Sequence, residues 1–324
     1  MNSNMNSRQK IVTLLEQKSA LLVLLLLIIY GTIAFNNRFP TLLNIMDLLK
    51  QSSFLGIIAV GETMAILTGG IDLSVGSTFA LASVMTCYTQ DLPAPVMLLI
   101  PLLIGMVVGL FNGFVITKMN ITPFLATLAT MMGIRGIAYL VTNGGVTMQM
   151  SNAGFIAFSR VRVFGFLPTP AIIFILIILL GMLFMRYTST GRNVYAIGGN
   201  MEAARMMGVN LDKTLIFVYA VSGVLSALAG CLLTARMSSG DPTSGLGYEM
   251  TAIASAVLGG NVLTGGVGKV SGTFFGILAL STIGNLMNMQ GKISPAQQNV
   301  IMGAIILIII LFQSQLQKYR LEKA

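Results

Sequence analysis

The chain has 324 residues, of which 55% are apolar and 9% are charged, with a net charge of +9 and a mean hydropathy of +0.86. Because a soluble domain is about a quarter charged, this composition excludes a soluble globular protein. About ten membrane spans of about 20 residues fit the apolar content, and the polar stretches between them are too short for a soluble catalytic domain. Any module that hydrolyses ATP or captures a ligand is therefore expected on another chain.

Residue types exclude two further kinds of chemistry. Basic residues are scattered between apolar runs and are not interleaved with stacking aromatic side chains, so no nucleic-acid binding is expected. His is absent, and the two Cys residues, Cys87 and Cys231, lie in apolar runs. The sequence therefore offers too few ligands for zinc or haem and no Cys/His pair for nucleophilic catalysis. We expect no metal site and no catalytic group on this chain.

The sequence predicts an all-α fold, a polytopic bundle of about ten transmembrane helices with interrupted helices among them. The spans are expected at residues 20–35, 52–69, 75–89, 94–117, 122–142, 170–187, 214–236, 250–264, 270–289 and 297–313. The first run resembles a signal peptide, but no A-x-A-like cleavage site follows it, so it is interpreted as a span. The third and eighth runs are short and rich in Gly, which leaves nine or eleven spans as alternatives.

The basic residues predict the orientation of these spans. With the N-terminus in the cytoplasm, twelve Lys and Arg residues fall on the cytoplasmic side and six outside, in agreement with the positive-inside rule. Both termini are therefore expected in the cytoplasm. Residues 1–19 form the expected N-terminal cytoplasmic segment, residues 20–313 the transmembrane domain, and residues 314–324 the cytoplasmic tail.

A short repeat predicts two matching helix interruptions. The letters LTGG at residues 67–70 recur at residues 263–266, and GS at residues 76–77 is matched by GT at residues 272–273. Unwound backbone in a membrane is tolerated only where it is buried or lines a cavity, so paired interruptions point to a pathway, and a chance match between Gly-rich hairpins is the alternative. The residues expected at the gate or helix interruption are Gly69, Gly70, Asp72, Ser74, Gly76, Gly265 and Gly266.

Asp72 is expected to have a structural role at the first interruption. It follows the two glycines and precedes the next apolar run. An anion in this position caps the next helix through the free amides near Ser74 and Val75. A part in an inner gate is the alternative.

Two further glycine patterns are informative. Gly105, Gly109 and Gly113 are spaced by four, share one helix face and predict the close approach of another helix. Residues 263–271 contain a Gly-Lys pair but lack the first Gly and the final Ser or Thr of a phosphate-binding loop. The chain is therefore not expected to hydrolyse nucleotide by itself.

The polar loop at residues 188–213 predicts a short helix. Asn200 is a good N-cap, Glu202 lies in the first turn where the helix dipole favours an anion, and Arg205 lies late. Gly208 can end the helix. A short capped helix at the membrane face suits docking of a soluble partner. A loop that only covers the bundle is the alternative, and composition alone favours it.

Three longer motifs, in this order along the chain, resemble the ribose-type monosaccharide permeases of bacterial ABC importers. They are GIDLSVGS at residues 70–77, GRNVYAIGGNMEAARMMGV at residues 191–209 and GYEMTAIASAVLGG at residues 247–260. The resemblance covers nearly the whole chain. It implies a multi-pass permease of the bacterial inner membrane that moves ribose or a related sugar from periplasm to cytoplasm and catalyses no reaction itself.

The resemblance also implies partners. These are a cytoplasmic ATP-binding subunit that carries the ATP and Mg, a periplasmic sugar-binding protein, a second permease copy and membrane lipid, with no cofactor on this chain. Residues 200–208 would then be the coupling helix that contacts the ATP-binding subunit. The coupling residues expected in the loop are Gly191, Arg192, Gly198, Asn200, Glu202, Ala203, Ala204, Arg205 and Gly208.

Two charged residues, Glu62 and Arg135, are expected inside spans. Such charges are costly unless they are paired or face water, and their similar depths predict an ion pair between them. Separate snorkelling, or a place on the pathway, are the alternatives. The resemblance implies an uncharged residue at position 62, so Glu62 departs from the family pattern.

Passage of a neutral sugar requires hydroxyl and amide partners with few charges. The pathway candidates are Glu62, Asn112, Thr122, Arg135, Asn261, Asn285 and Asn288, and hydrogen bonding between helices is the alternative for the neutral ones. The outer segments at residues 141–168 and 236–249 are expected to dock the binding protein, with Arg160, Arg162 and Arg236 facing its acidic groups.

Three other functions stay open. An ion-driven secondary transporter would need an intramembrane carboxylate, for which Glu62 is the one good candidate. An intramembrane enzyme would need a base that the sequence does not offer. Among ABC permeases, a branched-chain amino acid or a nucleoside is the nearest alternative substrate.

Overall fold

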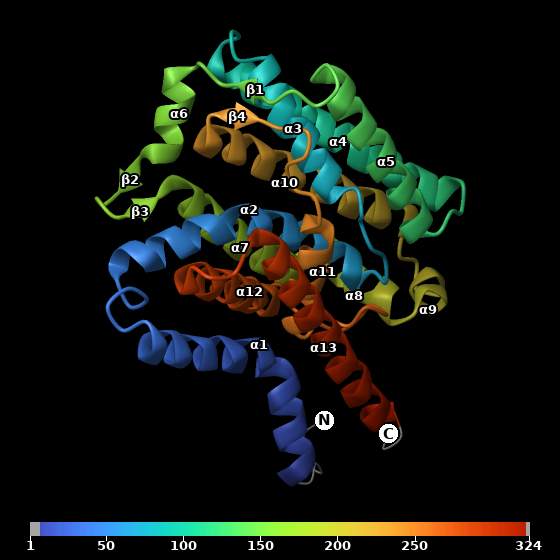
Figure 1. Cartoon of the computed structure of the whole chain (residues 1–324). Coiled ribbons are helices and arrows are strands. Elements are labelled where there is room, and N and C mark those ends of the chain that lie inside the picture. Colours follow the sequence, from blue (N-terminus) through green and yellow to red (C-terminus); the bar gives the residue numbers. More distant parts are fainter. Residues whose placement is uncertain (1–6, 322–324) are drawn as a thin grey trace.

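The computed structural model describes residues 7–321, which form a helical bundle (Figure 1). The helices are α1 (Ser7–Ala34), α2 (Leu42–Leu67), α3 (Val75–Tyr88), α4 (Ala94–Lys118), α5 (Pro123–Val141), α6 (Ala153–Arg160), α7 (Thr169–Tyr187), α8 (Ser189–Gly199), α9 (Met201–Met206), α10 (Leu211–Met237), α11 (Tyr248–Leu258), α12 (Val270–Gln290) and α13 (Pro295–Leu321). The two-residue strands are β1 (Met148–Gln149), β2 (Arg162–Val163), β3 (Leu167–Pro168) and β4 (Ser239–Gly240). The expected all-α fold is confirmed.

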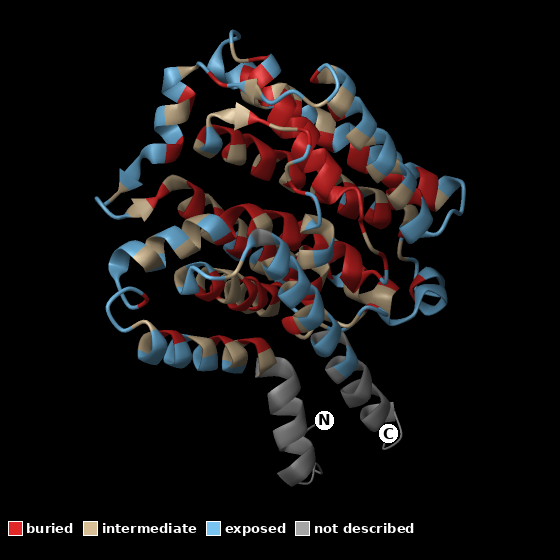
Figure 2. Cartoon of the chain, viewed as in Figure 1, coloured by how far each residue is buried: buried red, intermediate tan, exposed pale blue. Residues whose placement is uncertain are grey.

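α10 and α2 form the centre of the bundle. α10 packs against α4, α3 and α2, and α12 packs against α2, α11 and α1, so the order of neighbours is α4, α10, α2, α12 and α1 (Figure 1). Buried residues concentrate on α2, α3 and α10, whereas the outward sides of α1, α4 and α5 are exposed (Figure 2). Exposed residues there are large and apolar, for example Leu26, Ile33, Met132 and Leu140, as expected for contact with lipid.

Six helices of the described part are long and apolar enough to cross a membrane, namely α2, α4, α5, α7, α10 and α12. Four shorter apolar helical segments, Ser19–Ala34, Val75–Tyr88, Tyr248–Leu258 and Ala296–Ile308, lie where the other expected spans fall. The chain is therefore a multi-pass membrane protein.

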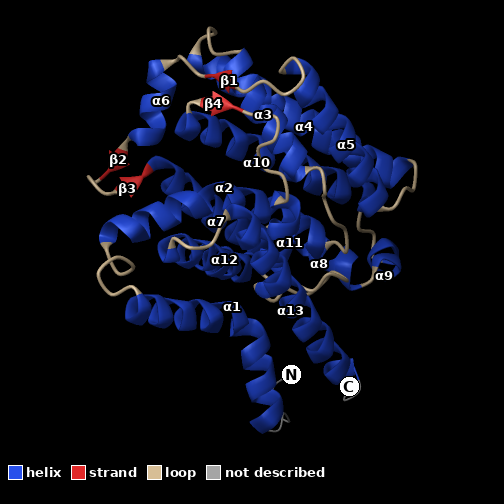
Figure 3. Cartoon of the chain, in the orientation of Figure 1, coloured by secondary structure: helices blue, strands red, loops and turns tan. Residues whose placement is uncertain are grey.

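Two short strand pairs fasten the connections at one end of the bundle (Figure 3). β1 pairs with β4 in antiparallel register, with Met148 opposite Gly240. β2 pairs with β3, with Arg162 opposite Pro168. The first pair joins the segment after α5 to the segment after α10, and the second is a hairpin between α6 and α7.

Away from the chain termini, two helix ends differ from the expected span limits. α2 begins at Leu42 and not at residue 52, because Thr41 caps it by accepting a hydrogen bond from the Asn44 N–H at 3.3 Å. α11 ends at Leu258 and not at residue 264, because Gly260 turns the chain with a φ of +86°. Apolarity therefore detected the membrane segments, whereas capping and glycine determine where the helices end.

The terminal helices are also longer than expected. α1 begins at Ser7 and α13 continues to Leu321, so helix extends into both segments that the sequence assigned to the cytoplasm. Residues 1–6 and 322–324 of those two segments lie outside the described residues.

The glycine spacing of α4 is confirmed as a helix contact. A Cβ atom on Gly109 would meet the backbone oxygen of Tyr219 and the Cα of Ala220, 2.7 Å away, on α10. A Cβ atom on Gly113 would meet the Cα of Ile216 at 2.6 Å. The two backbones touch directly, as small residues permit in membrane bundles.

We predict that Gly109→Ala lowers the thermal unfolding temperature of the detergent-solubilised chain. The added methyl group must displace the α10 backbone, at a cost of about 1–3 kcal/mol. Gly133→Ala is the matched control, because Gly133 lies in α5 with open space around its missing Cβ. Equal unfolding temperatures for the two variants would contradict the direct contact between α4 and α10.

Candidate functional site

The first helix interruption lies between α2 and α3. Gly69 adopts a φ of +83°, and the N–H groups of Thr68, Gly69 and Gly70 donate to carbonyls of the last turn of α2. The Asp72 N–H donates to Glu62 Oε1 at 3.2 Å. The turn therefore obtains its hydrogen bonds from α2 itself, and one of them comes from a buried carboxyl group.

Asp72 and Ser74 fasten this interruption to two other helices. It is 1% exposed, and its Oδ1 accepts hydrogen bonds from the Ser74 N–H at 3.0 Å and the Ser74 hydroxyl at 2.6 Å. Its Oδ2 accepts from the Ser222 hydroxyl of α10 at 2.8 Å, and Asn112 of α4 donates from Nδ2 to Ser74 Oγ at 2.9 Å. The expected capping of the Ser74 amide is confirmed.

Glu62 is fully buried, and the expected ion pair with Arg135 is wrong. Among the described residues the ion pairs are Lys118–Asp212 and Arg205–Glu202, and neither includes Glu62. The Arg135 guanidinium instead donates from Nη1 to the carbonyl oxygens of Pro242, at 2.6 Å, and Ser244, at 2.8 Å. The segment between β4 and α11 binds the guanidinium through these two carbonyl groups. Glu62 and Arg135 were expected at similar depths in the membrane, but this did not bring their charges together.

Three polar atoms near the first interruption have no hydrogen-bond partner in the described structure. They are Glu62 Oε2, Asn112 Oδ1 and the Tyr219 hydroxyl. A Cβ atom on Gly70 would meet that hydroxyl, so the glycine leaves room for Tyr219. Sequence analysis did not identify Tyr219 or Ser222, although both are polar residues on one face of an otherwise apolar span.

The second interruption, between α11 and α12, depends on Asn261. This residue is fully buried, its Nδ2 donates to Ala256 O at 2.7 Å and to Thr273 Oγ1 at 2.9 Å, and its Oδ1 accepts from the Lys269 N–H at 2.8 Å. The Thr273 hydroxyl is 2.7 Å from the hydroxyl of Thr63 on α2. Consecutive residues of α2, Glu62 and Thr63, therefore hold one interruption each.

The two repeated LTGG segments lie against each other. The Gly266 N–H donates to Leu67 O at 3.0 Å, and a Cβ atom on Gly69 would meet Thr264 O at 3.2 Å. Gly69 and Gly265 have the same left-handed conformation, with φ of +83° and +90°. The repeat thus corresponds to two turns in backbone contact that match at Gly69 and Gly265, whereas Gly266 has a positive φ of +73° that Gly70 lacks.

The loop at residues 188–213 folds as two helices, of which the sequence predicted only the second. α9 begins at Met201 and is capped by Asn200, whose Oδ1 accepts from the Ala203 N–H at 2.9 Å, and Gly208 follows it with a φ of +81°. The predicted cap and stop are confirmed. α8 begins at Ser189 and is capped by Thr188, whose hydroxyl accepts from the Gly191 N–H at 3.0 Å. Sequence analysis missed two signals of α8, namely this N-cap and the apolar residues Val194 and Ile197, which lie three positions apart and are buried.

Two large apolar side chains are exposed at the end of α9. Ala204 is buried beside Ile197 and Leu211, whereas Met206 and Met207 are 89% and 72% exposed. Figure 1 shows α8 and α9 at the edge of the bundle opposite the β2–β3 hairpin. Exposed thioether side chains on a well-anchored helix are suited to a protein partner.

The other expected coupling residues differ in exposure. Gly191 is buried, and a Cβ atom there would meet the backbone of Met185. Arg192 and Ala203 are exposed, and Arg205 lies 3.9 Å from Glu202 in an exposed ion pair. Such a pair contributes little to stability.

Glu62 and Asn112 both lie near the first interruption, whereas the other expected pathway residues are dispersed. Thr122 is exposed at the start of α5, Asn285 donates to Asn44 Oδ1 at 2.8 Å, and Asn288 accepts from Gln298 Nε2 at 2.9 Å. No hydrogen bond given by the described part of the chain joins two of the seven candidates. The hydrogen bonds of the neutral candidates connect helices or stabilise loops.

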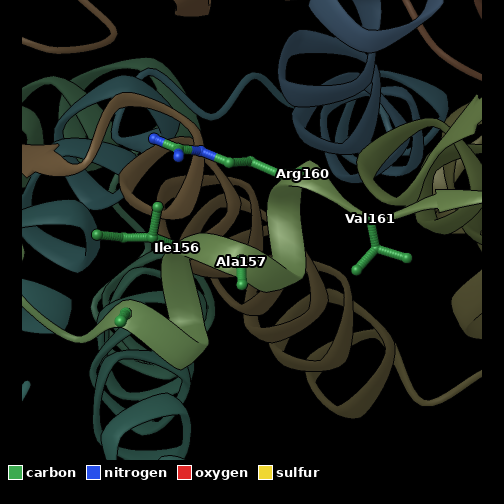
Figure 4. Close-up of a pocket in the computed structure, with 5 residues that line it drawn as sticks. Ile156, Ala157, Arg160 and Val161 are labelled. Atoms are coloured by element: carbon green, nitrogen blue, oxygen red, sulfur yellow. The ribbon is translucent and has the colours of Figure 1, made fainter.

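A surface pocket lies along α6, at the end of the bundle that carries the strand pairs. It is lined by Ala153, Ile156, Ala157, Arg160 and Val161. Figure 4 shows Ile156 and Arg160, one helical turn apart, extending to the same side of α6. Arg160 and Arg162 are exposed, and Arg236 lies over the Phe54 ring at 5.4 Å.

The amino-acid sequence of this bundle matches a known family of membrane proteins. Residues 44–310 match the family described as "Branched-chain amino acid transport system / permease component". The chain belongs to this family, so it is a permease component of a membrane transport system.

Individual relatives are more specific. The chain is 39% identical to the ribose import permease protein of Haemophilus influenzae over 94% of both chains, and 40% identical to that of Bacillus subtilis over 92% of both. It is 38% identical to the L-arabinose transport system permease protein of Escherichia coli, over 94% of this chain and 92% of that protein. No solved structure matches it. The resemblance to ribose-type permeases is thereby confirmed.

We predict that Asp72→Asn destabilises the chain more than Glu62→Gln. The two carboxyl oxygens of Asp72 accept three hydrogen bonds, and an amide at that place has only one acceptor oxygen, so it loses at least one buried bond at a cost of about 1–3 kcal/mol. Gln at position 62 keeps the single acceptor that the Asp72 N–H uses, so its cost is below about 1 kcal/mol. Thermal unfolding in detergent measures both variants, and a larger loss for Glu62→Gln would contradict the assignment.

Proposed function

We propose that this chain is the permease subunit of an ATP-driven ABC importer that carries a monosaccharide from the periplasm to the cytoplasm across the bacterial inner membrane. The observation that supports this most is the identity of 36–40% with permeases named for ribose, L-arabinose and fructose import over nearly the whole chain. The family description names branched-chain amino acids, but these relatives favour a sugar. Ribose is the first candidate.

The proposed topology has ten spans with both termini in the cytoplasm. Ten apolar helical segments support the count. Two of the four shorter ones are parts of the long helices α1 and α13, and the other two are the short helices α3 and α11. The basic residues near α8 and α9 support the orientation, because the positive-inside rule assigns that end to the cytoplasm. They are Arg186, Arg192, Arg205 and Lys213, together with Lys118, which pairs with Asp212.

The proposed partner at the cytoplasmic end is an ATP-binding subunit that docks on α9. The supporting features are the exposed Met206 and Met207 and the anchoring of α9 through the buried Ala204. ATP and Mg belong to that subunit. Residues 188–213 are proposed as the coupling loop, and residues 20–313 as the permease domain between the two end segments.

The proposed partner at the periplasmic end is a sugar-binding protein. Lys50 interacts with the charges of Arg236, Arg162 and Arg160 and with the acidic Asp47, so basic side chains outnumber acidic ones in this group. Such a group favours a partner with acidic residues. We also propose a second copy of the permease and lipid around the exposed apolar helices.

Transport in this scheme needs no bond-making residue on the permease. The binding protein delivers the sugar, ATP binding moves α9, and the helices switch access from one side to the other. The buried Glu62 already accepts a hydrogen bond from the Asp72 backbone, which disfavours its use as the ion-coupling group of a secondary transporter.

Uptake by cells tests the proposed function. We expect deletion of this chain from its native host to abolish high-affinity uptake of one radiolabelled sugar among ribose, L-arabinose and fructose, and to leave leucine uptake unchanged. We expect this uptake to follow the cellular ATP level and to continue after the ion gradients are dissipated, because ATP hydrolysis is the proposed energy source. Loss of leucine uptake with normal sugar uptake would contradict the proposal.

A second prediction tests the docking site. We expect Met206→Lys to weaken binding of the ATP-binding subunit at least about tenfold, since docking must desolvate the new charge. A cation at the end of a helix is compatible with the helix dipole, so α9 should still form. Co-purification and ATP hydrolysis in detergent measure the effect.

Met237→Lys is the matched control for this experiment. Met237 is also an exposed methionine at the last position of a helix, but it lies at the far end of α10 from α9. We expect this variant to retain the ATP-binding subunit. Equal binding by both variants would exclude α9 as the docking site.

A further inference from the structure

Three chain segments that are far apart in the sequence meet at one point without a side chain between them. They are the end of α2 at Leu67, the end of α8 at Gly198 and the turn at Gly265 and Gly266. A Cβ atom on Gly198 would meet Leu67 O, Gly266 N and, at 3.0 Å, the carbonyl carbon of Gly265. A methyl group therefore has no room at this point.

The glycines of the second interruption show the same close contact. A Cβ atom on Gly265 would lie 2.7 Å from Gly69 N and 2.9 Å from Gly198 Cα. A Cβ atom on Gly266 would lie 2.7 Å from Gly199 N. With the hydrogen bond from Gly266 N–H to Leu67 O, this glycine contact joins α8 to both helix interruptions.

A side chain of α8 reinforces the contact. The Tyr195 hydroxyl donates to Gly268 O at 3.1 Å. Burial raises the pKa of Tyr195, so the hydroxyl keeps its proton at neutral pH and remains a donor. α8 is thus bound to the second interruption by a hydrogen bond and to both interruptions by backbone contact.

Backbone contacts of this kind transmit displacement. A side chain between two segments can change its rotamer and absorb a shift, whereas close-packed backbones have no such freedom. α8 continues into α9 through Asn200, and the two interruptions lead into α3 and α12. A movement of α9 therefore reaches both following helices through one point.

We propose that Gly198 is a positioning residue that couples the movement of α9 to both helix interruptions, so that α3 and α12 shift together. This inference rests on the proposed function, because the ATP-binding subunit supplies the movement. Gly198 acts through backbone contact and binds neither sugar nor nucleotide.

Gly198→Ala and Gly199→Ala form a matched pair for the test. Both glycines lie in the last two positions of α8, so the gain in helix propensity is similar, but Gly199 has nothing within 4 Å of its missing Cβ. Each variant is reconstituted in vesicles with the ATP-binding subunit and the sugar-binding protein. The measured quantities are assembly, ATP hydrolysis and imported radiolabelled ribose per ATP hydrolysed.

We expect Gly198→Ala to assemble and hydrolyse ATP but to import at least about tenfold less ribose per ATP, because the displaced contact separates α8 from the interruptions. Gly199→Ala should stay within about twofold of the unmodified chain. Unchanged import per ATP in Gly198→Ala, or the same loss in both variants, would overturn the inference.

Tyr195→Phe provides a second test that does not disturb the packing. Loss of one net hydrogen bond should lower ribose imported per ATP by about fivefold. If Gly198→Ala fails to assemble, this variant decides, and an unchanged ratio overturns the inference. An unmodified chain whose ATP hydrolysis is stimulated by none of ribose, L-arabinose and fructose would contradict the proposed function, whereas coupled transport unaffected by Gly198→Ala would contradict the inference alone.

Discussion

Hydrogen bonding of the backbone at the two helix interruptions is the constraint on which the rest of the structure depends. Chain that leaves a helix inside an apolar bundle needs new partners for its N–H and C=O groups, since an unsatisfied buried group costs on the order of a few kcal/mol. Glu62 and Asp72 supply partners at the first interruption, and Asn261 supplies them at the second. The bond from Gly266 N–H to Leu67 O joins the two turns.

This constraint explains the polar residues of α2 and the glycines around its end. Glu62 and Thr63 are fully buried and consecutive, and they serve the first and the second interruption in turn. Once the turns lie backbone against backbone, no Cβ atom fits between them, and α8 joins the contact through Gly198. A surface helix and two interior turns thereby become one mechanical unit, which is what an externally driven permease requires.

Local rules predicted more of this structure than long-range reasoning did. Apolar runs located the membrane helices, and capping rules identified Asn200 and Gly208 because such signals act within one turn. The predicted Glu62–Arg135 pair was wrong because depth along a helix does not determine which way a side chain points. The carbonyl groups of Pro242 and Ser244, which accept the hydrogen bonds of Arg135, could not be predicted from the sequence. The repeat marked two similar turns, but their contact with each other and with Gly198 arises only from tertiary packing.

Hydrogen exchange of the two interruptions tests the central claim most directly. The measurement compares backbone amides at residues 67–74 and 261–269 in the assembled transporter, with and without a non-hydrolysable ATP analogue. We predict that nucleotide changes exchange in both segments together, including the Gly266 amide that bonds to Leu67 O. A change confined to one segment, with the other unaffected, would contradict the account that α8 moves both as a unit.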